Sequence, residues 1–511
     1  MREENRRIAK NTLVVYARLI ITTLLGLVSS RFVLNALGAS DYGLYNVVGA
    51  IVIMFSFITS ALYCTTTRFI NYEQGKADGN VNRIFNISLV IHIVFAIVAL
   101  ILLESIGVFY INNYLNVAVG KGADAMFVFQ VSTVMTCLSL IGVPYNSLFI
   151  VHEDFRIIAI IDIVSSIVKF AFVLFLLYYN GNLLRFYALC MAIATMLTSL
   201  SYFFLSRRRW PYITKFKLVR NKGEYKEILF FNNFSLLSAA ALIVRNQGSN
   251  MVVNYFFGTI VNAAYAISYS VQGYIITFVG NFDTASAPQI TQNISRGNLD
   301  RTVFLASSTC RICILLTLLI LFPIYNELEF ILHLWLGDGL PEGTVTFCKC
   351  TLLVALISST SGGITQFING TGKLKWFTLQ YVILYVLVLL LSVGLYMIGF
   401  PPYTIIILYF FADVLSRLNQ LFLLQRYVHF NMIRFVQRSY MRPLCVFMCG
   451  AVFVMISSKI EVELIIWHVL NFVLSLLFMA ISIFVFGLYK EEKTIIFSYV
   501  KRFLLTSKIT K

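Results

Sequence analysis

The stretch that decides the fold is ILFFNNFSLLSAAALIVRNQGSNMVVNYFF, residues 228–257. A transmembrane helix needs about 20 mostly apolar residues, and this run is long enough to cross a bilayer. Its centre, Arg245–Asn250, is polar, so it marks either a loop between two shorter spans or a polar stretch at membrane depth. In the second case contact with lipid would be costly, and the stretch must face protein or a water-filled cavity.

The whole chain has the composition of an integral membrane protein. Of its 511 residues, 59% are hydrophobic and only 12% are charged, whereas about 25% are charged in soluble globular domains. The same composition excludes disordered and fibrous proteins. Two close cysteine pairs, Cys310/Cys313 and Cys348/Cys350, have no further ligands nearby in the sequence. We therefore interpret them as buried apolar residues and predict no metal site.

Apolar runs of membrane-spanning length recur along the sequence and predict about 14 transmembrane helices. Their bounds are 11–36, 42–64, 84–107, 125–150, 157–179, 183–205, 228–257, 260–280, 303–325, 346–368, 376–398, 403–425, 443–458 and 464–487. The polar residues 1–10 lead into the first run without a small-residue cleavage site, which predicts an uncleaved first span rather than a signal peptide.

The distribution of Lys and Arg predicts the orientation of the chain. With a cytoplasmic N-terminus, 30 of the 40 basic residues fall in cytoplasmic segments and only 2, Lys121 and Lys459, in external loops. This asymmetry follows the positive-inside rule and places both termini in the cytoplasm. It also accounts for the formal charge of +17 without a nucleic-acid partner. A loop at Arg245–Asn250 would move 14 basic residues outside, so 228–257 is predicted to be one helix.

Segment lengths and weak internal similarity predict two six-helix lobes around a central cavity. Gly38 and Gly258 follow the first span of each half. Tyr45 and Tyr265 are separated by the same number of residues as these two glycines. Because six is even, both halves begin inside, and the repeat is parallel. The predicted organisation is a first lobe at 1–206, a basic cytoplasmic linker at 207–227, a second lobe at 228–426, two additional helices at 427–487 and a basic cytoplasmic tail at 488–511.

Charged residues inside the predicted spans are the candidate site residues, because an ionised side chain at mid-bilayer costs roughly 2.5–3.5 kcal/mol on insertion scales. The candidate substrate-binding cations are Arg245, Arg311, Arg18, Arg31, Lys169 and Arg417, and the candidate ion-coupling carboxylates are Asp162 and Asp413. The excess of basic groups predicts a cavity that attracts anions. Arginine forks are suited to phosphate oxygens.

Internal ion pairs are an alternative interpretation of four of these residues. Asp413 and Arg417 are at i and i+4 of one helix, close enough to pair. Asp162 and Lys169 are two turns apart on one helical face. In both cases pairing would lower the cost of burial without any further role.

Arg245 is the first candidate for a contact with substrate phosphate, because it lies near the middle of its run with no carboxylate within two turns. The alternative is a distant structural partner, such as Asp162 or Asp413. For Arg18 and Arg31 the alternative is snorkelling of the side chain to the membrane interface.

Enzyme motifs are not found in the sequence. It contains no Walker A loop, no dinucleotide fingerprint, no H-E-x-x-H and no soluble segment large enough to hold a nucleotide. We therefore predict no cofactor, and a drive from an ion gradient, the membrane potential or the substrate gradient. Together with the basic cavity, these features predict a transporter of a phosphate-bearing or otherwise anionic amphiphile.

Short motifs follow one another in the second half of the chain. They are Gln247–Gly258, Val261–Ala264, Pro288–Thr291, Leu334–Gly337, Gly370–Trp376 and Gly399–Pro402. This ordered set resembles the bacterial oligosaccharide (O-antigen-type) flippases of the multidrug, oligosaccharidyl-lipid and polysaccharide exporter superfamily. The resemblance implies two six-helix lobes around a central cavity. It also implies translocation of polyprenyl-diphosphate-linked sugar repeats across the bacterial inner membrane by alternating access, for lipopolysaccharide or other surface polysaccharide.

The resemblance implies a lipid-linked oligosaccharide as substrate and membrane lipids as surroundings, with a polysaccharide polymerase and chain-length machinery as partners. Two relatives of the same fold remain alternatives: a peptidoglycan lipid-precursor flippase and a cation-coupled drug exporter, which would favour cavity carboxylates. An integral-membrane polymerase or glycosyltransferase is a further alternative. Such an enzyme should carry a large polar external loop, and the external loops 108–124 and 326–345 are short.

Overall fold

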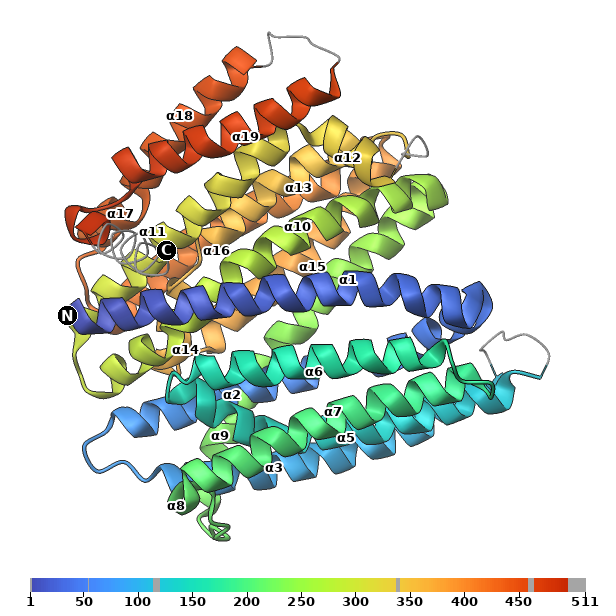
Figure 1. The fold of residues 1–511 in the computed structure, drawn as a ribbon. Coiled ribbons are helices and arrows are strands. Elements are labelled where there is room, and N and C mark those ends of the chain that lie inside the picture. Colours follow the sequence, from blue (N-terminus) through green and yellow to red (C-terminus); the bar gives the residue numbers. More distant parts are fainter. Residues whose placement is uncertain (1, 54, 114–119, 337–340, 458–463, 495–511) are drawn as a thin grey trace, which may run out of the picture. The chain divides into compact units, whose positions relative to one another are not determined.

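The computed structural model describes residues 2–53, 55–113, 120–336, 341–457 and 464–494. Throughout these ranges the regular structure is helical (Figure 1). Ten helices are long and apolar enough to cross a membrane, or eleven when the bent pair Thr344–Ser359 and Ile364–Thr371 is counted as one span. The predicted all-α membrane fold is confirmed, and the count of 14 spans stays a prediction.

The helices form two compact units, here called the N-lobe and the C-lobe. The N-lobe consists of Ala9–Ala240 with Ile294–Arg296, and the C-lobe mainly of Ala241–Asn293 and the chain from Gly297 onward. The division at Ala240/Ala241 lies inside a helix, α9 (Lys222–Ile243).

The N-lobe is organised around α5 (Gly122–Val151), which packs against α2 (Ser56–Gly75), α3 (Val81–Leu102) and α7 (Leu183–Arg209) (Figure 1). Side chains such as Phe129 and Phe149 of α5 are wholly buried in these contacts, which supply the apolar packing of the lobe. The remaining elements are most of α1 (Arg2–Ile53), η1 (Leu103–Gly107), α4 (Val108–Asn113), α6 (Phe155–Leu176), α8 (Pro211–Thr214) and most of α9.

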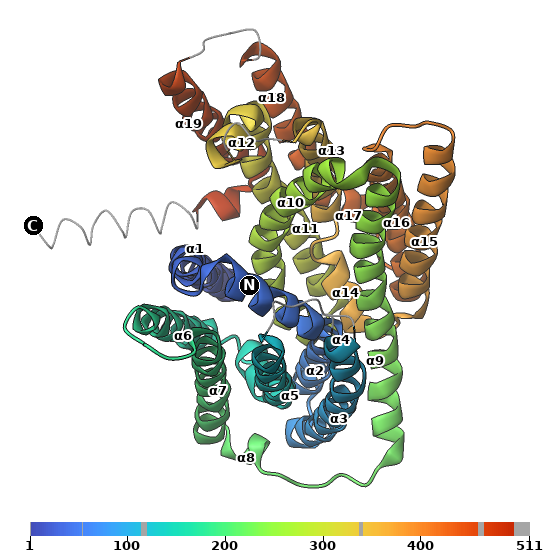
Figure 2. The same cartoon turned by 90° about the vertical axis from the view of Figure 1, so that its right-hand side faces the viewer.

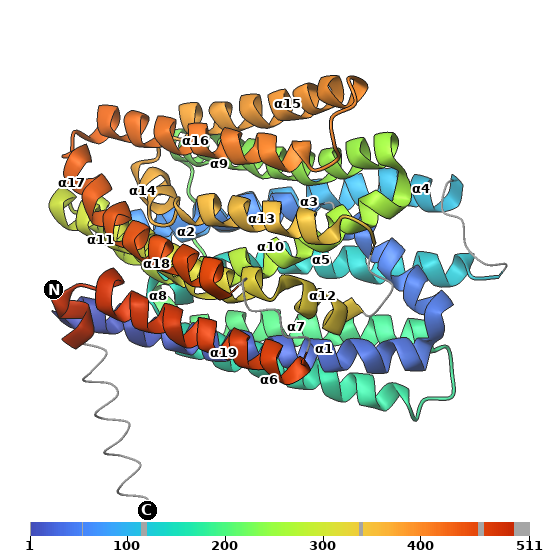
Figure 3. The same ribbon diagram turned by 90° about the horizontal axis from the view of Figure 1, so that it is seen from above.

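The C-lobe is organised around α11 (Leu299–Asn326), which packs against α13 (Thr344–Ser359), α18 (Arg442–Ser457) and α19 (Ile465–Ser482) (Figure 3). A second pair, α15 (Lys375–Met397) and α16 (Thr404–Val428), runs side by side in the same lobe (Figure 2). The remaining elements are η2 (Val244–Gly248), α10 (Ser249–Ser295), α12 (Leu328–Leu336), α14 (Ile364–Thr371), α17 (Met432–Val436), η4 (Gln437–Met441) and η5 (Ile483–Gly487).

The two additional helices expected at 427–487 are long and apolar enough to span, over Met432–Ser457 and Ile465–Gly487. A buried polar contact joins the second of them, α19, to the rest of the C-lobe. A carboxylate oxygen of Glu327, the residue between α11 and α12, lies 2.7 Å from Nδ1 of His468, and the other accepts a hydrogen bond of 2.5 Å from Asn471. Because a buried carboxylate is costly without partners, this contact ties α19 to the α11–α12 corner.

The quoted run 228–257 lies in one continuous helix, Lys222–Gly258, as the charge distribution predicts. Its polar centre does not split the helix; instead the backbone widens there into the π-turn η2. A π-turn of this kind is a local bulge that is frequent at functional sites. It leaves Arg245 buried inside the C-lobe.

Gly38 and Gly258 mark the same backbone feature in the two lobes. Each interrupts a long helix with a positive φ, +75° at Gly38 in α1 and +78° at Gly258 in α10. Residues with a Cβ rarely adopt such φ values, so the break is placed at glycine. The two glycines that occupy corresponding positions in the halves of the sequence therefore also interrupt corresponding helices in the structure.

A third glycine, Gly363, ends the bend between α13 and α14, with φ +71°. A Cβ at this position would lie 2.3 Å from the carbonyl oxygen of Ala306, whereas a Cβ at Gly258 would meet nothing within 4 Å. Both alanine variants carry the backbone cost of about 1–3 kcal/mol. Only Gly363→Ala adds an overpacking cost of about 1–3 kcal/mol.

We therefore expect Gly363→Ala to lower the thermal unfolding temperature of the purified protein well below that of Gly258→Ala. The two variants make the same chemical change at a positive φ, so each serves as the control for the other. Equal unfolding temperatures would show that the backbone at 363 is not packed against α11.

Candidate functional site

The N-lobe contains a polar cavity of about 750 Å³. It is lined by α1, α2, α5, α6 and α7, and most of its lining residues are Ser, Thr or Tyr. Its amide is Asn146, and its charged residues are Arg18, Asp162 and Lys169. The volume lies within the range of about 300–1,000 Å³ that is usual for ligand pockets. The lining combines hydroxyl groups with an excess of positive charge.

An ion pair connects α1 to α6 across this cavity. Nη1 of Arg18 lies 2.9 Å from Oδ2 of Asp162, and the Tyr202 hydroxyl donates to Oδ1 of the same carboxylate at 3.1 Å. The Arg18 and Asp162 side chains are 25% and 31% exposed, so both remain accessible from the cavity. Their exposure means that the pair contributes little to stability and is open to competition from a bound anion.

Lys169 lies on the same helix as Asp162 and lines the same cavity. The alternative in which these two residues pair is wrong, because Arg18, 144 residues away in the sequence, takes the carboxylate. Within the described part of the chain no ion pair of Lys169 is found, so the lining carries two basic groups against one acidic group.

A second charged cluster lies in the C-lobe, where η2 packs against α15. Arg245 donates from Nη1 to the Tyr385 hydroxyl at 3.0 Å and lies 3.3 Å from Oδ2 of Asp413 on α16. Its guanidinium carbon is 4.5 Å from the ring centroid of Tyr409. The Arg245 and Asp413 side chains are 8% and 0% exposed. This is a closed, aromatic-walled ion pair rather than an open binding surface.

The alternative in which Asp413 pairs with Arg417 is therefore wrong. Arg417 donates instead to the Tyr381 hydroxyl at 2.7 Å and to Oε1 of Gln420 at 2.8 Å. The i, i+4 spacing allows a pair on the helix surface, but Asp413 is wholly buried and Arg245 reaches it from another helix. The distant structural partner considered for Arg245 is thus present.

The other two predicted cations lie elsewhere. Arg311 is wholly buried on α11, where it pairs with Glu492 and lies 4.2 Å from the ring centroid of Tyr489. It contributes neither to the N-lobe cavity nor to the Arg245 cluster. The side chain of Arg31 lies outside the described residues.

Sequence reasoning that follows charge misses the uncharged part of the N-lobe cavity. Neighbouring small polar residues, such as Thr59/Ser60, Ser165/Ser166 and Thr198/Ser199, line it from three helices. Each pair is visible in the sequence inside or beside an apolar run. Such pairs also occur at helix–helix contacts, so only the fold shows that these face a cavity.

Comparison with solved structures places this arrangement in a known class of fold. The chain is similar to an outward-facing multidrug resistance MATE family transporter of the MOP superfamily, with a TM-score of 0.72, 13% identity, and 83% of this chain and 95% of that chain covered. It is similar to a MOP superfamily transporter from Pyrococcus furiosus, with a TM-score of 0.69, 14% identity and coverage of 82% and 95%. It is also similar to a mutant of a Vibrio cholerae MATE transporter, with a TM-score of 0.64, 15% identity, and 83% of this chain and 97% of that chain covered.

At this level of identity the comparison shows the fold alone, which is that of MOP superfamily transporters. The sequence adds the family. Residues 8–293, more than half of the chain, match the family of polysaccharide biosynthesis proteins, and the chain belongs to that family. No curated protein matches it in sequence. The chain is thus a multi-pass membrane protein of the polysaccharide biosynthesis family, and it shares its fold with solved transporters.

Proposed function

We propose that this chain is a flippase for polyprenyl-diphosphate-linked oligosaccharides in the bacterial inner membrane, serving the synthesis of O-antigen, lipopolysaccharide or another surface polysaccharide. The observation that carries the proposal is the lining of the N-lobe cavity. Sugar hydroxyls donate and accept hydrogen bonds, and so do Ser, Thr, Tyr and Asn side chains. A diphosphate needs cationic donors, which Arg18 and Lys169 supply in the same cavity.

The Arg18–Asp162 pair suggests how binding is linked to the conformational change. A phosphate oxygen that engages Arg18 competes with Asp162, whose partner lies 2.9 Å away in this structure. Released from that pair, the Asp162 carboxylate becomes available for a coupling ion. Asp413 could bind a coupling ion in the same way only if the closed Arg245–Asp413 pair opened. We therefore propose that Asp162, and not Asp413, is the first carboxylate to bind the coupling ion.

A cation-coupled drug exporter shares the fold and is the second candidate. A cationic drug would need carboxylates that face the cavity, just as a phosphate needs cations there. Among the described residues that line the N-lobe cavity, Asp162 is the single carboxylate, and Arg18 already neutralises it. The lining therefore supports an anionic, sugar-bearing substrate better. A peptidoglycan lipid precursor has the same chemistry, and only a substrate measurement separates the two.

The proposed flippase is tested by deleting its gene and analysing the lipid-linked saccharides of the cell. We expect cells that lack the surface polysaccharide and accumulate lipid-linked repeat units on the inner leaflet. Expression of the wild-type chain should restore the surface polysaccharide. Unchanged surface polysaccharide combined with increased drug sensitivity would instead favour the exporter. Accumulation of peptidoglycan precursor, with arrested growth, would identify the other flippase.

The proposal includes an orientation with both termini in the cytoplasm, as the distribution of Lys and Arg predicts. A reporter enzyme that is active only in the periplasm, fused after Asn180 in the turn between α6 and α7, is expected to be active. The same reporter fused after Lys222, at the start of α9, is expected to be silent. Active and silent fusions in the opposite order would reverse the orientation of the whole chain.

A further inference from the structure

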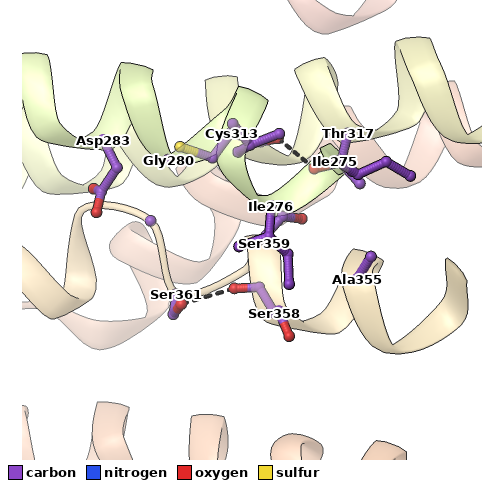
Figure 4. A pocket seen from close by; sticks show the side chains of 12 residues that line it. Ile275, Ile276, Gly280, Asp283, Cys313, Thr317, Ala355, Ser358, Ser359 and Ser361 are labelled. Atoms are coloured by element: carbon purple, nitrogen blue, oxygen red, sulfur yellow. Dashed lines mark hydrogen bonds between the residues drawn. The ribbon is translucent and has the colours of Figure 1, made fainter. Parts of the chain in front are cut away.

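A smaller pocket lies within the C-lobe, apart from the charged clusters described above. Its volume is about 160 Å³, and it is lined by α10, α11, α13 and the bend that follows α13. Figure 4 shows Asp283 at one end, with the hydroxyl-bearing side chains of Thr317, Ser358, Ser359 and Ser361 around the remainder. Asp283 was not expected as a site residue from the sequence.

The Asp283 carboxylate is held only by neutral groups. Oδ1 accepts the backbone N–H of Gly363 at 2.7 Å, and Oδ2 accepts Nε2 of Gln366 at 2.9 Å. Among the described residues no ion pair of Asp283 is found, and none of the residues that line the pocket is basic. Asp162 and Asp413, by contrast, are each neutralised by an arginine. Asp283 therefore differs from both carboxylates expected to couple ions.

Asp283 is half-buried, and a carboxylate that loses part of its hydration without gaining a cationic partner is costly in its charged form. Two neutral hydrogen bonds offset part of this cost, and a monovalent cation would remove the net charge. The pocket beside Asp283 is larger than the ~30 Å³ that one water molecule occupies. An ion, with or without a water molecule, has room there.

The hydroxyl groups that line the pocket can serve as cation ligands. Thr317 donates its proton to the carbonyl of Cys313 at 2.9 Å, and Ser361 donates to the carbonyl of Ser358 at 2.7 Å. With their protons engaged by the backbone, these oxygens keep lone pairs for another partner. A hard monovalent ion prefers such oxygen ligands, whereas a divalent ion would need more carboxylates than the one present.

The other titratable groups around Asp283 do not supply a counter-charge. Cys313 lines the pocket, and Cys310 and the Tyr440 hydroxyl both donate to one backbone carbonyl at the bend, at 3.1 and 3.3 Å. Arg417 lies on α16, which packs against α14, but it donates its hydrogen bonds to side chains of α15 and α16.

We propose that Asp283 binds a monovalent cation, H⁺ or Na⁺, and that this cation controls the bend between α13 and α14. The bend amounts to 47°, and Asp283 of α10 holds the N-terminal end of α14 through Gly363 and Gln366. Neutralising the carboxylate weakens both hydrogen bonds, so binding of the cation is linked to the position of α14. The role in transport rests on the proposed function, but the binding itself does not.

The first experiment measures binding of radioactive sodium to the purified full-length chain in detergent, without any saccharide. If Na⁺ is the ligand, we expect one ion per chain in the wild type and none in Asp283→Asn. Asp300→Asn is the matched control, because it makes the same chemical change at an exposed carboxylate of the same lobe. It should bind sodium like the wild type.

The second experiment detects H⁺ as the ligand in the same preparations. The wild type and Asp300→Asn should show the infrared band of a protonated carboxyl group, which disappears as the pH is raised, and Asp283→Asn should lack it. Sodium binding and a carboxyl band that are both unchanged in Asp283→Asn would overturn the proposal. Because no saccharide is present, failure here leaves the proposed flippase untouched, and failure of the flippase leaves this site untouched.

If Asp283→Asn does not fold, Gln366→Leu provides a second test of cation binding at Asp283. It removes one hydrogen bond to the charged carboxylate while leaving the carboxylate in place. Loss of such a bond favours the neutralised form, so the midpoint of sodium binding or of protonation should shift about tenfold toward lower cation concentration. An unchanged midpoint would show that this carboxylate does not bind the cation.

Discussion

Replacing Arg18 by Ala is expected to reduce transport about ten- to a hundredfold while leaving the amount of folded protein nearly unchanged. The loss follows from one charge-assisted hydrogen bond to phosphate, worth about 1.5–3 kcal/mol. The stability cost is small because the Arg18–Asp162 pair is partly exposed, and exposed pairs contribute about 0–1 kcal/mol. Lys169→Ala should behave similarly. The measurement is surface polysaccharide in a deletion strain, normalised to protein level.

Arg156→Ala is the matched control for these variants, since it removes a cation from the exposed first turn of α6, outside the cavity. It should restore wild-type polysaccharide. Lys169→Arg keeps the charge and should retain part of the transport. Wild-type polysaccharide from Arg18→Ala together with Lys169→Ala would remove these cations from the binding site.

Replacing Arg245 by Ala is expected to lower the amount of folded protein sharply. Removing one partner of a buried pair leaves the other charge uncompensated, at a cost of about 3–5 kcal/mol, and Asp413 is wholly buried. The double variant Arg245→Met/Asp413→Leu removes both charges at similar volume. It should recover most of the lost abundance, because replacing a buried pair by apolar residues is often neutral. Both variants are compared by thermal unfolding and membrane abundance.

The same two variants also test the phosphate contact expected for Arg245 from the sequence. If the pair is purely structural, the double variant should regain transport together with abundance. If Arg245 also engages substrate during translocation, the double variant should be abundant but inactive. Normal abundance of Arg245→Ala alone would contradict the structural role that the closed geometry gives it.

Local properties of the sequence were sufficient for the broad architecture. Composition and run lengths predicted an all-α membrane protein, and the charge bias predicted that the polar centre of 228–257 does not interrupt its helix. Gly38 and Gly258 were recognisable because a positive φ restricts the residue type at a helix break. Each of these features depends on neighbouring residues or on summed composition.

The partners of the charged residues were not predictable in this way. Arg18 and Asp162 are 144 residues apart, and Arg245 and Asp413 are 168 apart, so packing alone brings them together. Local spacing suggested other partners for both carboxylates. Asp283 was not among the predicted site residues because the apolar run before it ends at 280, whereas the helix continues to Ser295.

The most direct test of the proposed function is translocation by the purified chain in proteoliposomes that contain a polyprenyl-diphosphate-linked oligosaccharide. A membrane-impermeant glycosidase added outside cleaves only the saccharides that have reached the outer leaflet. We predict that the wild type makes the inner-leaflet pool accessible, that Arg156→Ala does the same, and that Arg18→Ala does so about ten- to a hundredfold more slowly. If the inner-leaflet pool stays protected with folded wild-type protein, or if Arg18→Ala matches the wild type, the proposed flippase with its phosphate site in the N-lobe cavity is contradicted.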